Sequence, residues 1–150
     1  MLKIISHRGN LIGPNPHREN HPEYIDRAIT SGFDVEVDLW VKDNVAYLGH
    51  DEPSHRVTTG WLLERGDRLW IHCKNIAAAV WAQDRISTLN YFWHQNDTMT
   101  LTSKGYWWVY PGNQPIANSI AVMPELKNDS TELCYGVCTD YPVDYAEGRL

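Results

Sequence analysis

The sequence predicts an α/β protein built on a parallel sheet or barrel, with a single domain over residues 1–150. Three observations support this prediction. The chain has 150 residues, which is a usual length for one domain. Strand patterns alternate with helix patterns in the N-terminal half, which favours a parallel sheet. The C-terminal half continues the strand patterns, but its connecting segments are too short, or too rich in Pro, Gly and Asn, for full helices.

The N-terminal segment begins with an apolar stretch, residues 3–6, that is typical of a strand and too short for a signal peptide. A loop rich in Gly, Pro and Asn follows. The first helix is expected to begin near Pro22, because proline suits a first turn, and to end at Gly32. Its apolar residues share one face: Tyr24, Ile25, Ala28 and Ile29. Residues 33–40 then alternate apolar and polar side chains, which predicts a strand.

The elements that follow are shorter. Residues 42–44 form a turn, and residues 45–48 are expected to pair back on the preceding strand as a hairpin. A short helix at 59–65 precedes a strand at 69–73, and an Ala-rich helix follows at 76–84. The remaining strands are expected at residues 91–93, 106–110, 119–123 and 135–138.

The composition excludes several classes of protein. Hydrophobic residues make up 43% and charged residues 21%, and no apolar run approaches the ~18 residues of a membrane span. The formal charge of −6, without a Lys/Arg cluster, argues against nucleic acid as a partner. Three cysteines with no C-x-x-C pair fit a reduced, cytoplasmic chain. Seven Trp and eight Tyr can fill a core or offer stacking surfaces for sugars or bases, and core packing is the favoured interpretation.

Polar residues gather in and after three of the expected strands. His7 and Arg8 follow the first strand and His50 follows the hairpin strand, and paired histidines suit proton transfer near neutral pH. Glu36 and Asp38 lie two apart in one strand, so both point to one face about 7 Å apart. Two such carboxylates need a cation or proton between them, and they suit Mg²⁺ or Ca²⁺. The alternative is an acidic face that only meets water. The other histidines outside the strands are expected at the surface: His17, His21, His55 and His94.

The order and spacing of these groups resemble the glycerophosphodiester phosphodiesterases, whose usual pattern runs HRG, EN(T), GAD-x-(I)-E-x-D, TKDG and HD. The matching segments are His7-Arg8-Gly9, Glu19-Asn20, Gly32-Phe33-Asp34-Val35-Glu36-Val37-Asp38, Val41-Lys42-Asp43-Asn44 and His50-Asp51. Residues 136–142 resemble the family's closing G-(I/V)-x-T-D-x-P segment. The resemblance is dense over residues 3–53, thin in the middle, and returns at 136–142.

The resemblance implies a reduced or distorted TIM-type (β/α) barrel, with helices trimmed in the C-terminal half, that hydrolyses glycerophosphodiester-like substrates with a divalent cation. It implies that Glu36 and Asp38 are metal ligands. His7 and His50 would be the acid–base pair, and Arg8 would contact the phosphate. The implied partner is a small-molecule phosphodiester of lipid metabolism. The chain itself is expected to have no membrane-spanning segment.

Three further positions follow from the resemblance. Glu19, at the family's EN site, would order the metal site or the substrate, and Lys74 matches a phosphate-binding lysine. The family carries Glu two residues before that lysine, where this chain has His72. Imidazole is a poorer ligand for Mg²⁺ or Ca²⁺ and a better one for Zn²⁺ or Mn²⁺. His72 therefore indicates a changed metal preference, weak cation binding, or a carboxylate supplied instead by Glu125. Packing of His72 without a metal is a further alternative.

The length of the chain also departs from the family. A TIM barrel typically takes about 250 residues, so most of the later helices must be absent and the site is expected to be shallow and open. Two other functions stay open. One is a non-catalytic or weakly active phosphate- or sugar-phosphate-binding barrel, and the other is a phospholipase-type lyase that forms a cyclic phosphate. The sequence also leaves the oligomeric state open.

Overall fold

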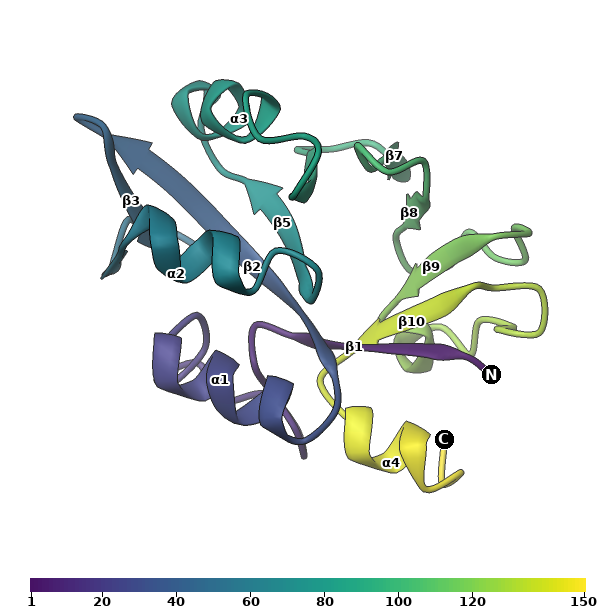
Figure 1. The fold of residues 1–150 in the computed structure, drawn as a ribbon. Coiled ribbons are helices and arrows are strands. Elements are labelled where there is room, and N and C mark those ends of the chain that lie inside the picture. Colours follow the sequence, from purple (N-terminus) through teal and green to yellow (C-terminus); the bar gives the residue numbers. More distant parts are fainter.

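A mixed sheet of ten strands dominates the computed structural model, which describes residues 1–150 (Figure 1). The strands are β1 (Lys3–His7), β2 (Asp34–Lys42), β3 (Val45–Leu48), β4 (His55–Val57), β5 (Leu69–Cys73), β6 (Asn90–Trp93), β7 (Met99–Leu101), β8 (Trp107–Val109), β9 (Ser119–Val122) and β10 (Gly136–Thr139). The helices are α1 (Pro22–Thr30), α2 (Thr59–Glu64), α3 (Ile76–Gln83) and α4 (Pro142–Ala146), with a 3₁₀ turn at Pro124–Leu126. None of these helices could cross a membrane.

The register of the strands decides which residues meet. The strand order is β4-β3-β2-β1-β10-β9-β8-β7, and β5 pairs with β2 and β6. The ladders that join β6, β5, β2, β1, β10, β9 and β8 in turn are parallel, whereas β2–β3, β3–β4 and β7–β8 are antiparallel. His7 of β1 lies opposite Glu36 of β2, and Asp38 of β2 lies opposite His72 of β5.

The expectation of a reduced TIM-type (β/α) barrel is wrong. The sheet is a curled half-barrel of mixed strand direction with four short helices, and no ladder joins β6 to β7 or β8 (Figure 1). The loop after β7 meets β6 only locally, where the Ser103 N–H donates to the Tyr91 carbonyl at 2.8 Å. The physical reason is that the segment between β6 and β9, residues 94–118, is short and holds two short strands and no helix. This part of the chain therefore lacks the strand–helix units that close a barrel.

Alternating side chains on β2 and β5 divide the core in two. A cluster of 18 buried residues lies between the sheet and α1, α2 and α3, and it includes the β2 residues Val35, Val37 and Leu39. A second cluster fills the inside of the curl with large rings: Trp70, Phe92 and Trp108. Glu36 and Asp38 point to this inner side and are 3% and 0% exposed. The acidic face of β2 therefore lies in a polar interior and does not face water.

Candidate functional site

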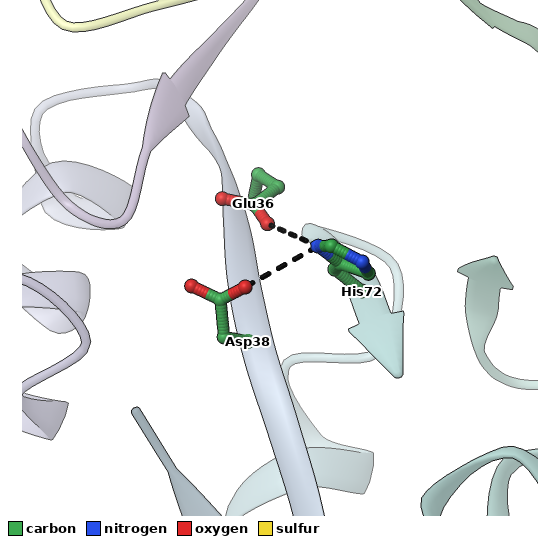
Figure 2. Close-up of side chains that lie close together, drawn as sticks. All are labelled: Glu36, Asp38 and His72. Carbon is green, nitrogen blue, oxygen red and sulfur yellow. Dashed lines mark ion pairs between the residues drawn. The ribbon is translucent and has the colours of Figure 1, made fainter. Parts of the chain in front are cut away.

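Glu36, Asp38 and His72 form a compact group inside the curl (Figure 2). Because Glu36 and Asp38 lie two residues apart in β2, both carboxylates point to the same face. The β2–β5 register brings the His72 ring to that face from the neighbouring strand. His72 Nδ1 lies 3.3 Å from Asp38 Oδ1 and 4.0 Å from Glu36 Oε1. One atom from each residue lies within 4.8 Å of the other two, so the group can hold a metal ion.

The state of the two carboxylates fits a cation. Glu36 Oε2 and Asp38 Oδ1 are buried and have no hydrogen-bond partner, which is costly for a carboxylate oxygen. Burial first, and then the charge of Asp38, raise the pKa of Glu36, while the positive charges around it act in the opposite direction. A divalent cation held by the three side chains would supply the missing partner, and carboxylate and imidazole are both ordinary ligands of such ions.

Cationic and amide side chains of the protein also contact the Asp38 carboxylate. Arg8 Nε lies 3.0 Å from Asp38 Oδ2, and Lys74 Nζ lies 3.7 Å from Oδ1. The Asn20 amide donates to Oδ2 at 2.8 Å and accepts from the Asp38 backbone N–H at 2.9 Å. Burial alone would raise the pKa of Asp38, but its close contact with His72 and the charge of Arg8 hold that pKa below its ordinary value. Asp38 is therefore ionised at neutral pH.

The turn after β1 holds Arg8 against this group. Arg8 has a φ of +55°, in the left-handed region that non-glycine residues rarely adopt. Its N–H donates to the Glu36 carbonyl at 3.0 Å, and its carbonyl accepts from the Asn20 N–H at 3.0 Å. Gly9 follows with a φ of +92°, and a Cβ there would lie 2.9 Å from the Tyr24 ring. Glycine is therefore needed at this position.

His7 is held by a residue to which the sequence patterns assigned no role. Its Nδ1–H donates to Asp140 Oδ1 at 2.8 Å, and the Asn10 amide donates to the same oxygen at 2.8 Å. Nε2 of His7 lies 3.9 Å from Glu36 Oε2. Burial lowers the pKa of His7, but the bond to Asp140 and the charge of Glu36 outweigh it and raise that pKa. The signal for Asp140 is its place, because it directly follows β10, the parallel neighbour of β1.

Two glutamates that the sequence analysis considered, Glu19 and Glu125, lie outside the metal group, which is our name for Glu36, Asp38 and His72. One carboxylate oxygen of Glu19 is 3.2 Å from Arg8 Nη1, and the other accepts from the Asn10 amide at 2.9 Å. Glu19 therefore holds Arg8, which contacts Asp38, and Asn10, which contacts Asp140. Glu125 accepts from the Thr139 hydroxyl at 2.8 Å and is not part of the group. The suggestion that Glu125 replaces the carboxylate missing at the His72 position is therefore wrong.

A cavity of about 610 Å³ lies against the metal group. The predicted site residues on its wall are His7, Arg8, Glu36, His50, His72 and Lys74. An aromatic part of the wall is formed by Trp93, Trp108 and Tyr110. The His50 side chain is 46% exposed, and its Nδ1–H donates to Asp51 at 2.7 Å. Both candidate acid–base histidines therefore line one cavity, each with Nδ1 paired to an aspartate.

The arrangement of these residues can bind a cation and an anionic group side by side and can move protons next to them. Its assignment to a family has no support beyond the motifs, because we found no match to this chain among protein-family models, curated proteins or solved structures.

Proposed function

We propose that this chain is a metal-dependent phosphodiester hydrolase that acts on a glycerophosphodiester-like substrate. The observation that carries the proposal is the set of complementary groups around one cavity. These are three potential cation ligands, two histidines that are each paired with an aspartate, and the cationic side chains of Arg8 and Lys74. Phosphodiester hydrolysis uses all three kinds of group, because the phosphate is anionic and both the attacking and the leaving oxygen exchange a proton.

The two histidines supply the proton transfers. Asp140 holds the Nδ1 proton of His7 and Asp51 that of His50, so Nε2 is the free nitrogen of each ring. One Nε2 removes the proton of the attacking hydroxyl as the new P–O bond forms. The other ring acts while protonated at both nitrogens, and its Nε2 gives its proton to the leaving alcohol oxygen as the old P–O bond breaks. Asp140 and Asp51 act as positioning residues, because they fix the tautomer that leaves Nε2 available.

Arg8 and Lys74 bind the phosphate in this scheme. They lie 3.0 Å and 3.7 Å from Asp38, so their charges are balanced by that carboxylate before substrate arrives. Glu36, Asp38 and His72 would hold a divalent cation, which would neutralise charge on the non-bridging phosphate oxygens. Arg8 and Lys74 are then shared between Asp38 and the phosphate.

The two other functions left open by the sequence give different results in the same assay. A lyase uses a neighbouring hydroxyl of the substrate as the nucleophile and ends at a cyclic phosphate, whereas a hydrolase goes on to the phosphomonoester. A phosphate-binding protein without turnover retains inorganic phosphate but releases no alcohol. The observation that favours this phosphate-binding alternative is that two cationic side chains, Arg8 and Lys74, face the cavity.

The test is hydrolysis of bis(p-nitrophenyl) phosphate and of glycerophosphodiesters by the chelator-treated chain, with Mg²⁺, Ca²⁺, Mn²⁺ and Zn²⁺ supplied one at a time. We expect turnover with at least one cation, and rates about 10²- to 10⁴-fold lower in His7→Ala and His50→Ala. His17→Ala is the control, because His17 is exposed and lies outside the cavity. No turnover with any cation, or full activity in both site variants, contradicts the proposal.

A further inference from the structure

The two ring nitrogens of His72 both face oxygen atoms. Nε2 lies 3.1 Å from the backbone carbonyl oxygen of His94. Nδ1 lies 3.3 Å from Asp38 Oδ1 and 4.0 Å from Glu36 Oε1. Carbonyl and ionised carboxylate oxygens only accept hydrogen bonds, so each nitrogen needs a proton or a cation between it and the oxygens it faces.

At Nε2 the positive group is a proton. The His94 carbonyl is within hydrogen-bond reach, so Nε2–H donates to it. When this is the only proton on the ring, the Nδ1 lone pair is directed at the two carboxylates (Figure 2). One nitrogen lone pair and two carboxylates that converge in this way form the donor set of a metal ion.

The orientation of the His72 ring is fixed by packing on its face and at its far nitrogen. Phe92 stacks on the ring with the centroids 5.0 Å apart and the planes at 17°. The His94 ring is itself stacked on Tyr110, with the centroids 3.9 Å apart, which steadies the segment whose carbonyl accepts from Nε2. An outer partner on the second nitrogen is how metal-binding histidines are commonly oriented.

We propose that His72 makes this site selective for Zn²⁺, followed by Mn²⁺, over Mg²⁺ and Ca²⁺, with Nδ1 as the ligand atom. The inference rests on the metal dependence in the proposed function and names the class of cation. Imidazole nitrogen suits Zn²⁺, whereas Mg²⁺ and Ca²⁺ prefer oxygen ligands in larger number. Three protein ligands beside an accessible cavity are also the usual arrangement of a catalytic zinc site, which keeps a position open for water or substrate.

The first test is binding of the metal ions alone, by calorimetric titration of the chelator-treated chain. We expect affinity to fall from Zn²⁺ through Mn²⁺ to Mg²⁺ and Ca²⁺. His72→Glu replaces the ligand nitrogen by a hard oxygen, so it is expected to lower the ratio of Zn²⁺ affinity to Mg²⁺ affinity. Loss of a single outer partner of a ligand already costs a metal site roughly 10-fold in affinity, and we expect replacement of the ligand atom to change the ratio by at least that factor. His72→Gln makes the same exchange without a new charge and serves if the Glu variant does not fold.

Zinc binding elsewhere on the chain is controlled by a second histidine variant. His21 and His55 are another pair of imidazoles in contact, with ring centroids 4.9 Å apart. His55→Gln removes that pair and is expected to leave the tight Zn²⁺ site unchanged. Loss of the tight site in His55→Gln, with retention in His72→Gln, overturns the proposal.

The second test identifies the ligand residue. Co²⁺ substitutes for Zn²⁺ and strongly shifts the proton NMR signals of its ligands. A histidine bound through Nδ1 keeps its Nε2–H, which gives a shifted signal that disappears in D₂O. We expect that signal in the unaltered chain and in His55→Gln, and its loss in His72→Gln.

The outcomes separate this inference from the proposed function. Mg²⁺ binding as tight as Zn²⁺ binding, or a Co²⁺-shifted N–H signal that survives in His72→Gln, overturns the selectivity. Selective Zn²⁺ binding without phosphodiester turnover upholds the selectivity and refutes the hydrolase. Turnover with equal affinity for all four cations refutes the selectivity and upholds the hydrolase.

Discussion

Replacing Asp140 by Asn tests the contact that fixes His7. The Asp140 carboxylate accepts from His7 Nδ1–H and from the Asn10 amide, both at 2.8 Å. An Asn amide keeps one acceptor oxygen but carries no charge, so both hydrogen bonds lose the strength that an ionised acceptor gives them. The two side chains are only 18% and 16% exposed, so solvent screens them weakly. Since a hydrogen bond to a charged group contributes about 1.5–3 kcal/mol, we expect Asp140→Asn to lower the free energy of unfolding by about 2 kcal/mol.

The loss depends on pH, with signs set by the two pKa shifts. Burial raises the pKa of Asp140, but its bond and charge interaction with His7 outweigh burial and lower it. Its stabilisation is therefore present above the unfolded value of about 4 and is lost as pH falls through the folded pKa. The pKa of His7 is raised, so its stabilisation is present below the unfolded value of about 6.5 and is lost as pH rises through the folded pKa. The destabilisation is thus largest between about pH 4 and about pH 6.5.

Urea unfolding of the chelator-treated chain at about pH 3, about pH 5.5 and about pH 8.5 measures this dependence. Asp67→Asn is the matched control, because Asp67 is an exposed aspartate. The reasoning is refuted if Asp140→Asn lowers the free energy of unfolding equally at all three pH values. A loss near pH 5.5 no larger than that of the control refutes it as well.

Three further predictions concern stability and the buried acid. Gly9→Ala is expected to cost more unfolding free energy than Gly32→Ala: both have positive φ, with strain of about 1–3 kcal/mol, but only the first meets a neighbouring ring. Equal losses on thermal unfolding would argue against the clash. Trp108→Ala removes a 2% exposed core ring and costs about 3–5 kcal/mol, against under about 1 kcal/mol for the 38% exposed Trp107, as urea unfolding would show. Glu36→Gln is expected to stabilise the metal-free chain at neutral pH, because burial raises the pKa of that carboxyl, and to weaken divalent-cation binding in calorimetry. A metal-free variant less stable than the parent contradicts this account.

Local patterns were sufficient for most elements and insufficient for their closure. Strict alternation over residues 33–40 predicted β2, and proline and glycine at positions 22 and 32 bracketed α1. The strands β4 and β7 were missed because each has three residues with at most one buried, whereas the equally short β8 buries two of its three apolar residues. Whether the sheet closes depends on how segments far apart in the chain pair, and no local pattern carries that information.

The metal group was predictable where its members share a strand, and its supporting contacts were not. Glu36 and Asp38 follow from their spacing in β2, and His72 from the match of one strand to a family pattern. Asp140 and His7 are 133 positions apart in the chain and meet only because β1 pairs with β10. Long-range pairing of this kind follows from the tertiary structure, so the sequence motifs could place Asp140 after a strand without linking it to His7.

The wrong fold class and the assembled group are compatible, because the three potential cation ligands, His7 and Asp140 depend on only four strands of the sheet. β10, β1, β2 and β5 are successive parallel neighbours. Parallel neighbours carry their carboxyl ends to the same edge, so Asp140, His7, the two β2 carboxylates and His72 meet whether or not the sheet closes into a ring. Loss of closure acts instead on the opposite wall of the cavity, where short strands and the rings of Trp108 and Tyr110 stand. The group that can hold a cation is therefore separable from the part of the fold that the motifs misrepresented.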